Sequence, residues 1–191
     1  MVNRVTIEQG RQLLTLARAG ITAHLAGEPL PSLPRGSVFA QECGTFVTLK
    51  LDGQLRGCIG NIEPHGSLAE SVLRNSISAA VHDTRFQPLS GDELDRVRIE
   101  VSILTLPEPL NYDDSEDLVS SLKPGIHGVI LRLGQRHAAT FLPQVWEQLP
   151  QPEQFLDQLC RKAGVNHSAW REEQPTIEVY EVEKFSEGEA E

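Results

Sequence analysis

A short stretch in the first third of the chain has the clearest potential for chemistry. It reads Leu-Arg-Gly-Cys-Ile-Gly over residues 55–60, so a guanidinium, a thiol and two glycines lie close together. Alternate side chains of a strand share one face, which places Arg56 beside Cys58. A nearby guanidinium favours thiolate over thiol, the usual route to a nucleophilic cysteine. The stretch therefore predicts an activated thiol, with Gly57 and Gly60 leaving room for a ligand near the backbone.

A packing role for Cys58 competes with the reactive one. A cysteine within an apolar strand is commonly a small buried hydrophobe, and glycines in strands often mark bulges or turns. Cys160 shares a helical stripe with apolar residues, which predicts packing, and Cys43 precedes a strand without any pattern that indicates a role. The sequence leaves both interpretations of Cys58 open.

Three further side chains are candidate partners of Cys58. His127, in a glycine-flanked turn, is the first choice for an acid-base group, and its alternative is a hydrogen bond within its own turn. Glu100 faces away from the apolar residues of its strand, as a solvated side chain or as a general base lining a cleft. Arg85 follows a helix, where it either complements the helix dipole or binds an anion.

Charge and motif content exclude several classes of protein. The 191 residues include 17 basic and 27 acidic side chains, and this net charge of −10 opposes a general nucleic-acid-binding surface. A local basic pocket of Arg56, Arg74 and Arg85 keeps nucleic-acid modification as a weaker alternative. There is no zinc signature, Walker loop, dinucleotide fingerprint or nucleophile elbow, so the sequence predicts no metal site and no cofactor.

Cysteine usage and apolar runs indicate the cellular setting. The three cysteines form no C-x-x-C pair, and their odd number leaves at least one thiol free, which fits a reducing cytoplasm. The first residues lack the apolar core of a signal peptide, and no apolar run approaches the roughly 20 residues of a membrane helix. We therefore expect a cytoplasmic protein that does not associate with membranes.

Local signals indicate the elements that position these residues. Capping boxes open two amphipathic helices, and an Asp-Gly turn joins two alternating runs into a β-hairpin. A glycine turn joins a second hairpin, and a glycine closes a third helix. The expected elements are helix 5–26, hairpin 44–60, helix 67–83, strand 97–105, hairpin 128–142, helix 152–164 and a last strand over 176–185.

The second half of the chain repeats the element order of the first. Val47 aligns with Val129, 82 positions later, and Ile99 aligns with Ile177, 78 positions later. These offsets predict a duplicated β-β-α-β unit and therefore an α+β fold of two related lobes, with mostly antiparallel sheets flanked by helices.

We expect the first lobe over residues 38–106 and the second over 125–185, with helix 5–26 packing on the core. The residue that matches Cys58 in the second lobe is Thr140, so only the first lobe carries the thiol.

Six motifs in a fixed order closely resemble the AMMECR domain family over roughly residues 5–184. The resemblance implies a single AMMECR-type domain over residues 1–191, an α+β fold with a cleft between two lobes, and a functional surface around the first motif. Gln144 stands where a glutamate is frequent in the family, which removes an acid-base role at that position. The motifs are LRGCIG (55–60), TRFQPL (84–89), VSILT (101–105), GIHGV (125–129), TFLPQV (140–145) and LCRKAG (159–164).

The family has no established molecular activity, so the resemblance implies a setting more than a reaction. Its bacterial and archaeal members are similar to component A of the AmmeMemoRadiSam grouping, which also contains a Memo-type protein and a radical-SAM enzyme. That grouping implies a shared modification pathway with those two proteins as functional partners and an unknown substrate.

Two hypotheses of function remain. In the first, the protein is an enzyme in which Cys58 is a nucleophile or covalent carrier, Arg56 lowers its pKa and binds an anionic group of the ligand, and His127 transfers protons. In the second, it is a binding or scaffold module whose glycine-lined strand face receives a partner or substrate without chemistry of its own.

Overall fold

The protein, described here by a computed structural model of residues 4–188, divides into two compact units with a four-stranded sheet each. The first unit contains residues 4–105 and 183–188, and the second contains Leu106–Val182. Each unit has its own hydrophobic core. The fold is α+β, with two antiparallel sheets flanked by helices, as the sequence predicted.

The first unit is built on a sheet with strand order β2-β1-β3-β8. Its two long helices begin at the predicted capping boxes, where Thr6 and Ser67 accept the backbone N–H groups of Gln9 and Glu70. The elements are α1 (Ile7–Ala26), α2 (Ser37–Ala40), β1 (Thr45–Leu51), β2 (Gln54–Asn61), α3 (Leu68–Val81), α4 (Gly91–Leu94), β3 (Val97–Leu104) and β8 (Val182–Ser186).

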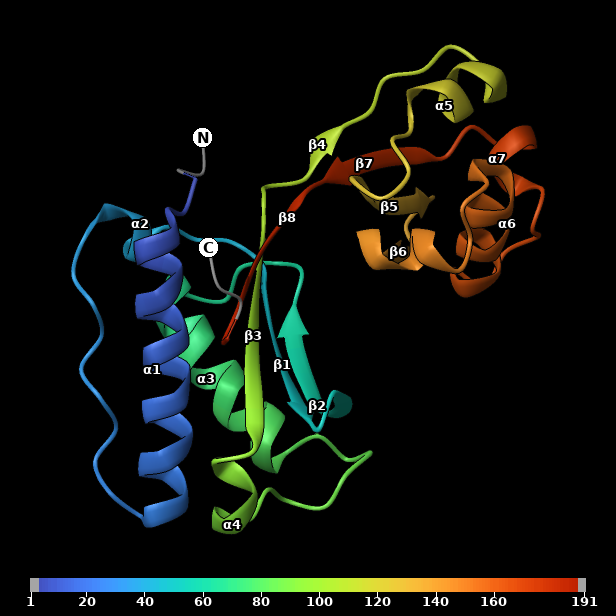
Figure 1. The fold of residues 1–191 in the computed structure, drawn as a ribbon. Coiled ribbons are helices and arrows are strands. Elements are labelled where there is room, and N and C mark those ends of the chain that lie inside the picture. Colours follow the sequence, from blue (N-terminus) through green and yellow to red (C-terminus); the bar gives the residue numbers. More distant parts are fainter. Residues whose placement is uncertain (1–3, 189–191) are drawn as a thin grey trace. The chain divides into compact units, whose positions relative to one another are not determined.

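Helices α1 and α3 cover one face of the first sheet (Figure 1). Alternate strand residues such as Val47, Leu49 and Ile99 are fully buried against these helices. The residues between them, including Thr48 and Glu100, point to the opposite face and are only half-buried. We call this opposite side of the first sheet the open face.

The second unit has strand order β4-β7-β5-β6. Its core is centred on Trp146 and Phe155, whose rings stack with centroids 3.8 Å apart. The elements are β4 (Glu108–Pro109), α5 (Ser115–Ser121), β5 (Gly128–Leu133), β6 (His137–Phe141), the 3₁₀ helix η1 (Pro143–Glu147), α6 (Pro152–Lys162), α7 (Ala169–Glu172) and β7 (Thr176–Tyr180).

The two sheets share a pairing pattern. In the first, Val47 pairs with Ile59 and Val101, and in the second, Val129 pairs with Phe141 and Val179. The residue numbers differ by 82 along the hairpins and by 78 along the third strands. These are the two offsets found in the sequence.

The predicted last strand over 176–185 is wrong in one respect, because it is two strands. β7 ends at Tyr180 and pairs with β5 in the second sheet, whereas β8 begins at Val182 and joins the edge of the first sheet beside β3. The run alternates without a glycine or proline, so no local signal marks the change of sheet.

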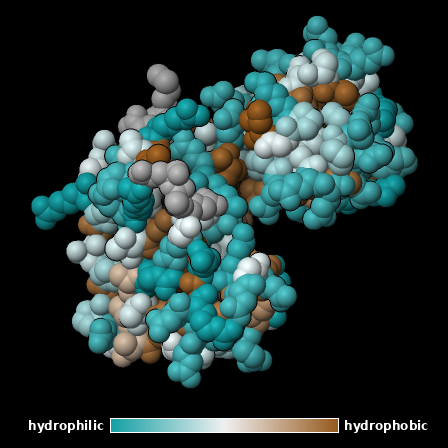
Figure 2. All heavy atoms as spheres, in the orientation of Figure 1, coloured by the Kyte–Doolittle hydropathy of each residue, from teal (hydrophilic) through white to brown (hydrophobic). Residues whose placement is uncertain are grey.

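The face seen in Figure 2 is mostly hydrophilic, with hydrophobic residues in small separate patches. Among residues 4–188, no helix has both the length and the apolar composition needed to cross a bilayer.

Candidate functional site

Cys58 lies on the edge strand β2, with its side chain on the open face. It pairs with Thr48 of β1, whose hydroxyl donates a hydrogen bond to the Cys58 Sγ at 3.3 Å. Thr48 pairs in turn with Glu100 of β3. Directly opposed residues of neighbouring strands share a face, so Cys58, Thr48 and Glu100 form one row across the open face. Cys58 is half-buried rather than enclosed in the core.

A β-bulge at Arg56 sets this row. The register pairs Lys50 with Leu55 but Leu49 with Gly57, so Arg56 is the extra residue of β2. Counting outward from the Asp52-Gly53 turn without a bulge would pair Thr48 with Gly57. The extra residue moves the pairing partner of Thr48 to Cys58.

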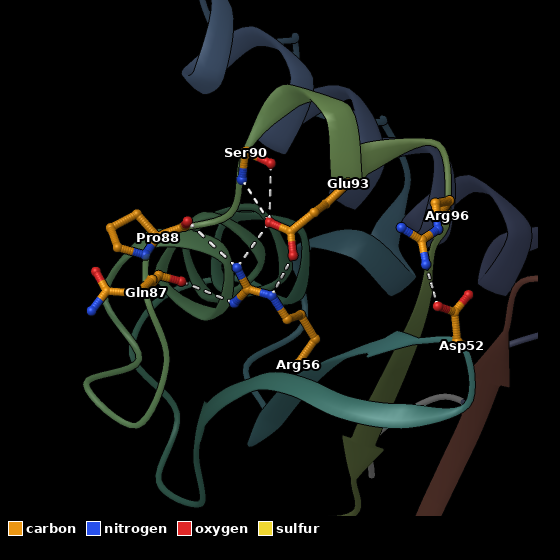
Figure 3. A network of polar contacts seen from close by, with 7 residues as sticks. All are labelled: Asp52, Arg56, Gln87, Pro88, Ser90, Glu93 and Arg96. Atoms are coloured by element: carbon orange, nitrogen blue, oxygen red, sulfur yellow. Dashed lines mark hydrogen bonds and ion pairs between the residues drawn. The ribbon is translucent and has the colours of Figure 1, made fainter.

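The expectation that Arg56 lies beside the thiol is wrong. Its guanidinium makes a two-point ion pair with Glu93 of α4, at 2.9 and 3.0 Å, and donates to the carbonyls of Gln87 and Pro88 (Figure 3). Hydrogen bonds from Arg56 and from Ser90 lower the pKa of Glu93 to about 2. Arg56 therefore ties β2 to the segment between α3 and β3.

The arginine next to Cys58 is Arg85. Its Nη2 donates to the Cys58 carbonyl at 3.1 Å, and its guanidinium also binds Asp83. Asp83 in turn accepts the Cys58 N–H at 2.8 Å, and the hydrogen bonds from Arg85 hold the pKa of this buried carboxyl well below its usual range. The two side chains thus occupy both outward backbone groups of Cys58, which a further strand would otherwise use.

Gly57 and Gly60 do not leave space for a ligand. A Cβ on Gly57 would lie 2.2 Å from the Ala79 carbonyl oxygen of α3, so Gly57 is needed where the helix crosses the strand. A Cβ on Gly60 would meet the Phe46 ring at 2.3 Å. Protein atoms already fill both positions, which corrects the prediction that these glycines expose the backbone.

Glu100 is half-buried on the open face between two lysines. Lys50 Nζ lies 3.0 Å and Lys184 Nζ lies 2.9 Å from the same oxygen, Oε2. Burial alone would raise the pKa of Glu100, but the hydrogen bonds and charges of Lys184 and Lys50 outweigh it, and the net pKa is lowered. An ionised carboxylate with two cationic partners is a weak proton acceptor, which opposes the general-base role.

His127 belongs to the second unit and is held by its own turn. Its Nδ1 accepts the Lys123 N–H at 3.3 Å, its backbone N–H donates to the Lys123 carbonyl, and its carbonyl accepts the Trp146 indole N–H. Burial, with the charge of Lys123, lowers the His127 pKa. This is the turn-stabilising alternative, and the other candidate residues all lie in the first unit.

Sequence reasoning missed Thr48, Asp83, Lys50 and Lys184. Asp83 and Arg85 are two residues apart, a spacing that a turn can bring together, but their contact with Cys58 spans 25 and 27 positions. Lys184 reaches Glu100 only because β8 crosses to the first sheet. Within residues 4–188, no group of three or more histidine, cysteine, aspartate or glutamate side chains is placed to hold a metal ion.

The comparisons with known proteins agree on one family. The AMMECR1 family profile matches residues 14–185. The chain belongs to the AMMECR1 family. It is 38% identical over its whole length to protein MK0488 of Methanopyrus kandleri, covering 94% of that protein. It is 36% identical to protein MJ0810 of Methanocaldococcus jannaschii, covering 96% of this chain and 92% of that one.

A solved structure of the same fold accompanies these relatives. The crystal structure of the uncharacterized protein PH0010 from Pyrococcus horikoshii matches with a TM-score of 0.82 and 32% identity, covering 96% of this chain and 94% of that chain. The AMMECR1 assignment therefore rests on sequence and structure together.

Proposed function

We propose that this AMMECR1-family protein is a binding component of a modification pathway and that the open face of the first sheet receives its partner or substrate. One observation carries the proposal: the candidate acid-base and activating groups are already engaged. Arg56 binds Glu93, Glu100 binds two lysines and His127 binds its own turn. A side chain held in this way is poorly suited to proton transfer, whereas the row across the open face remains partly exposed.

The partners we propose are a Memo-type protein and a radical-SAM enzyme. Support comes from the resemblance of the six motifs to component A of the AmmeMemoRadiSam grouping. A cytoplasmic location is part of the proposal, and three free cysteines support it. In this assignment the chain acts as one AMMECR-type domain, and only the first unit carries the binding surface.

Direct binding of the purified proteins tests this proposal. The chain is titrated calorimetrically with the Memo-type protein and with the radical-SAM enzyme of the same organism. A Thr48→Arg substitution places a bulky charge in the middle of the open face and should weaken binding at least about tenfold, or 1.4 kcal/mol. Cys58→Ser should stay within about twofold of wild type, because binding needs no thiol chemistry.

Thr22→Arg is the matched control, because Thr22 is exposed on α1 and its hydroxyl bonds only to its own helix. It should bind like wild type. No binding of either protein to the wild type would reject these partners. Equal losses in Thr48→Arg and Thr22→Arg would reject the open face as the surface.

A second candidate function is nucleophilic catalysis by Cys58. The observation that favours it is the hydroxyl of Thr48, which donates to Sγ while the thiol is half-buried, together with the positive charge of Arg85 at the Cys58 backbone. A donor to sulfur stabilises thiolate over thiol. His127 would be the acid-base partner in this scheme.

The alkylation rate of Cys58 as a function of pH separates the two functions. Cys43 and Cys160 are buried, so a Cys43→Ala/Cys160→Ala background isolates the third thiol. Fast alkylation of the folded protein with an apparent pKa well below about 8.5 supports the nucleophile, and Thr48→Val should then slow it. Alkylation only on unfolding eliminates the nucleophile.

Nucleic-acid modification has the weakest support. Its three arginines bind different acceptors: Arg56 binds Glu93, Arg85 binds Asp83 and Arg74 binds the His65 carbonyl.

We also infer an internal duplication of the β-β-α-β unit. The common offsets of 82 and 78 residues in strand register support it.

A further inference from the structure

A cluster of cations lies next to the Cys58 row on the open face. Lys50 and Lys184 both contact Glu100 Oε2 at about 3 Å, so their ammonium groups are at most about 6 Å apart. An ammonium group has three N–H donors, and each of these lysines uses one on Glu100. Among residues 4–188, neither has another hydrogen-bonding partner. Several N–H donors of the two lysines are therefore unused beside Glu100.

Arg98 adds a third positive charge. It lies directly opposite Lys50 in the β1–β3 pairing and is exposed. Its one hydrogen bond to a described residue goes to the Glu187 carbonyl at 3.3 Å. Like charges directly opposite each other destabilise a sheet, so this placement works against folding. This part of the open face therefore carries three cations and one carboxylate in a protein whose net charge is −10.

We infer that Lys50, Lys184 and Arg98 form a binding site for a phosphate group on the substrate that the open face receives. The inference rests on the proposed function, which assigns the substrate to this face. An external phosphate would complete the charge balance that Glu100 provides only in part. It would also explain why Lys50 and Arg98, two positive charges, lie directly opposite each other on this face.

Phosphate fits the donor set better than other anions. Lysine binds phosphate as a point charge, whereas a carboxylate is recognised best by a free arginine fork, and here the Arg98 guanidinium already donates to a carbonyl. A tetrahedral phosphate presents three outer oxygens, one for each cation. The net charge of −10 repels a phosphodiester chain, so the ligand carries an isolated phosphate.

The position of the cluster also bounds the substrate. Cys58 and Glu100 are on strands separated by β1, so they lie roughly 10 Å apart across the face, given a strand spacing of about 4.8 Å. This distance is short enough for a small molecule with its phosphate at the lysines to reach across Thr48 to Cys58. The substrate class that fits this site is a phosphorylated small molecule.

Nuclear magnetic resonance titration of the whole chain with inorganic phosphate tests the site, at pH 7 and constant ionic strength against chloride. The amides of Thr48, Lys50, Glu100 and Lys184 should shift and saturate. The Lys50→Gln/Lys184→Gln variant should bind at least about tenfold more weakly, because two charge-assisted contacts are lost. Glu100→Gln should bind about three- to tenfold more tightly, because the internal competitor is removed.

Lys123→Gln is the control, since Lys123 is an exposed lysine of the second unit, and it should leave the titration unchanged. Unchanged phosphate affinity in the double lysine variant, or weaker affinity in folded Glu100→Gln, would overturn the site. Equal saturation by acetate would overturn the phosphate class, and tighter binding of a short RNA would overturn the isolated phosphate.

Failure of the phosphate site and failure of the proposed function give different experimental outcomes. Loss of phosphate binding with intact partner binding would reject this site alone. Partner binding that fails while phosphate still saturates the lysine cluster would reject the partners and leave the site standing.

Discussion

A single inserted residue decides which arginine accompanies Cys58. Simple alternation assigns that place to Arg56, but the bulge makes Arg56 the unpaired residue, and its guanidinium binds Glu93 instead. Both charges are largely buried, with 13% and 24% of their side chains exposed. Removing one partner of such a pair leaves the other without compensation. Arg56 is therefore a structural residue whose effects on stability are measurable.

Glu93→Gln should lower the free energy of unfolding by about 1–2 kcal/mol at pH 7, because two charge-assisted hydrogen bonds from Arg56 are lost. The folded-state pKa of Glu93, about 2, is below the unfolded value of about 4.3. The stabilisation by the Arg56–Glu93 pair is thus complete above about pH 4.3 and disappears as the pH falls toward 2. Urea denaturation between pH 7 and 3 should show the deficit of the variant shrinking with acidity.

Asp52→Asn is the control, since Asp52 pairs with Arg96 in the same region (Figure 3) but both side chains are more than half exposed. It should change stability by less than about 0.5 kcal/mol. A deficit in Glu93→Gln that stays constant with pH would show that the ion pair is not its cause.

The close approach of α3 to Gly57 leads to a second prediction about a single residue. Gly57→Ala places a methyl group against the Ala79 carbonyl of α3, which should destabilise the protein by about 1–3 kcal/mol. Gly91→Ala has no heavy atom within 4 Å of the new Cβ and should be neutral or slightly stabilising. Thermal unfolding of both variants measures the contrast. Equal melting temperatures would mean that the helix does not press on β2.

At the scale of elements, the features predicted correctly are those that depend on residues close together in the sequence. The capping boxes of α1 and α3 and the Asp52-Gly53 hairpin are short-range features, and each lies where it was expected. The bulge and the change of sheet between β7 and β8 depend on packing against distant residues, and the sequence does not mark them. The same holds for the contact of Asp83 with Cys58, which only the folded loop makes.

The end of β8 is held to the first sheet by Arg18. This α1 side chain binds both carboxylate oxygens of Glu187 and the carbonyls of Leu94 and Val97. Glu187 also accepts the Ile99 N–H. One arginine thus joins a helix, the edge strand and the start of β3.

Arg18→Gln should destabilise the first unit by about 1–2 kcal/mol, given that about a third of the arginine side chain is exposed. Hydrogen exchange at the amides of β8 should accelerate more than at β1. Arg4→Gln is the control, because Arg4 also pairs with β8 through Glu183 but is 90% exposed. Similar exchange rates in the two variants would show that the Glu187 pair does not hold the strand.

At the scale of the whole molecule, the chain has two hydrophobic cores with matching strand register. Leu49 of the first and Leu131 of the second are 82 positions apart. Both are buried, and their pairing partners lie at equivalent positions of the two sheets. The second sheet repeats the open-face row only in part. Glu178 keeps the position of Glu100 and pairs with Arg132, whereas Thr140 occupies the position of Cys58 and Ile130 that of Thr48. Of the two similar sheets, only the first therefore carries the thiol and the hydroxyl that bonds to it.

Leu49→Ala and Leu131→Ala should each lower the stability of their own unit by about 2–5 kcal/mol, since each leaves a cavity in a separate core. Native-state hydrogen exchange should then show faster opening of β1, β2 and β3 in the first variant and of β5, β6 and β7 in the second. Phosphate binding at Lys50 and Lys184 should weaken in Leu49→Ala and persist in Leu131→Ala, because the lysine cluster lies wholly in the first unit. Equal acceleration in both units by either variant would instead mean that the two cores unfold as one cooperative body.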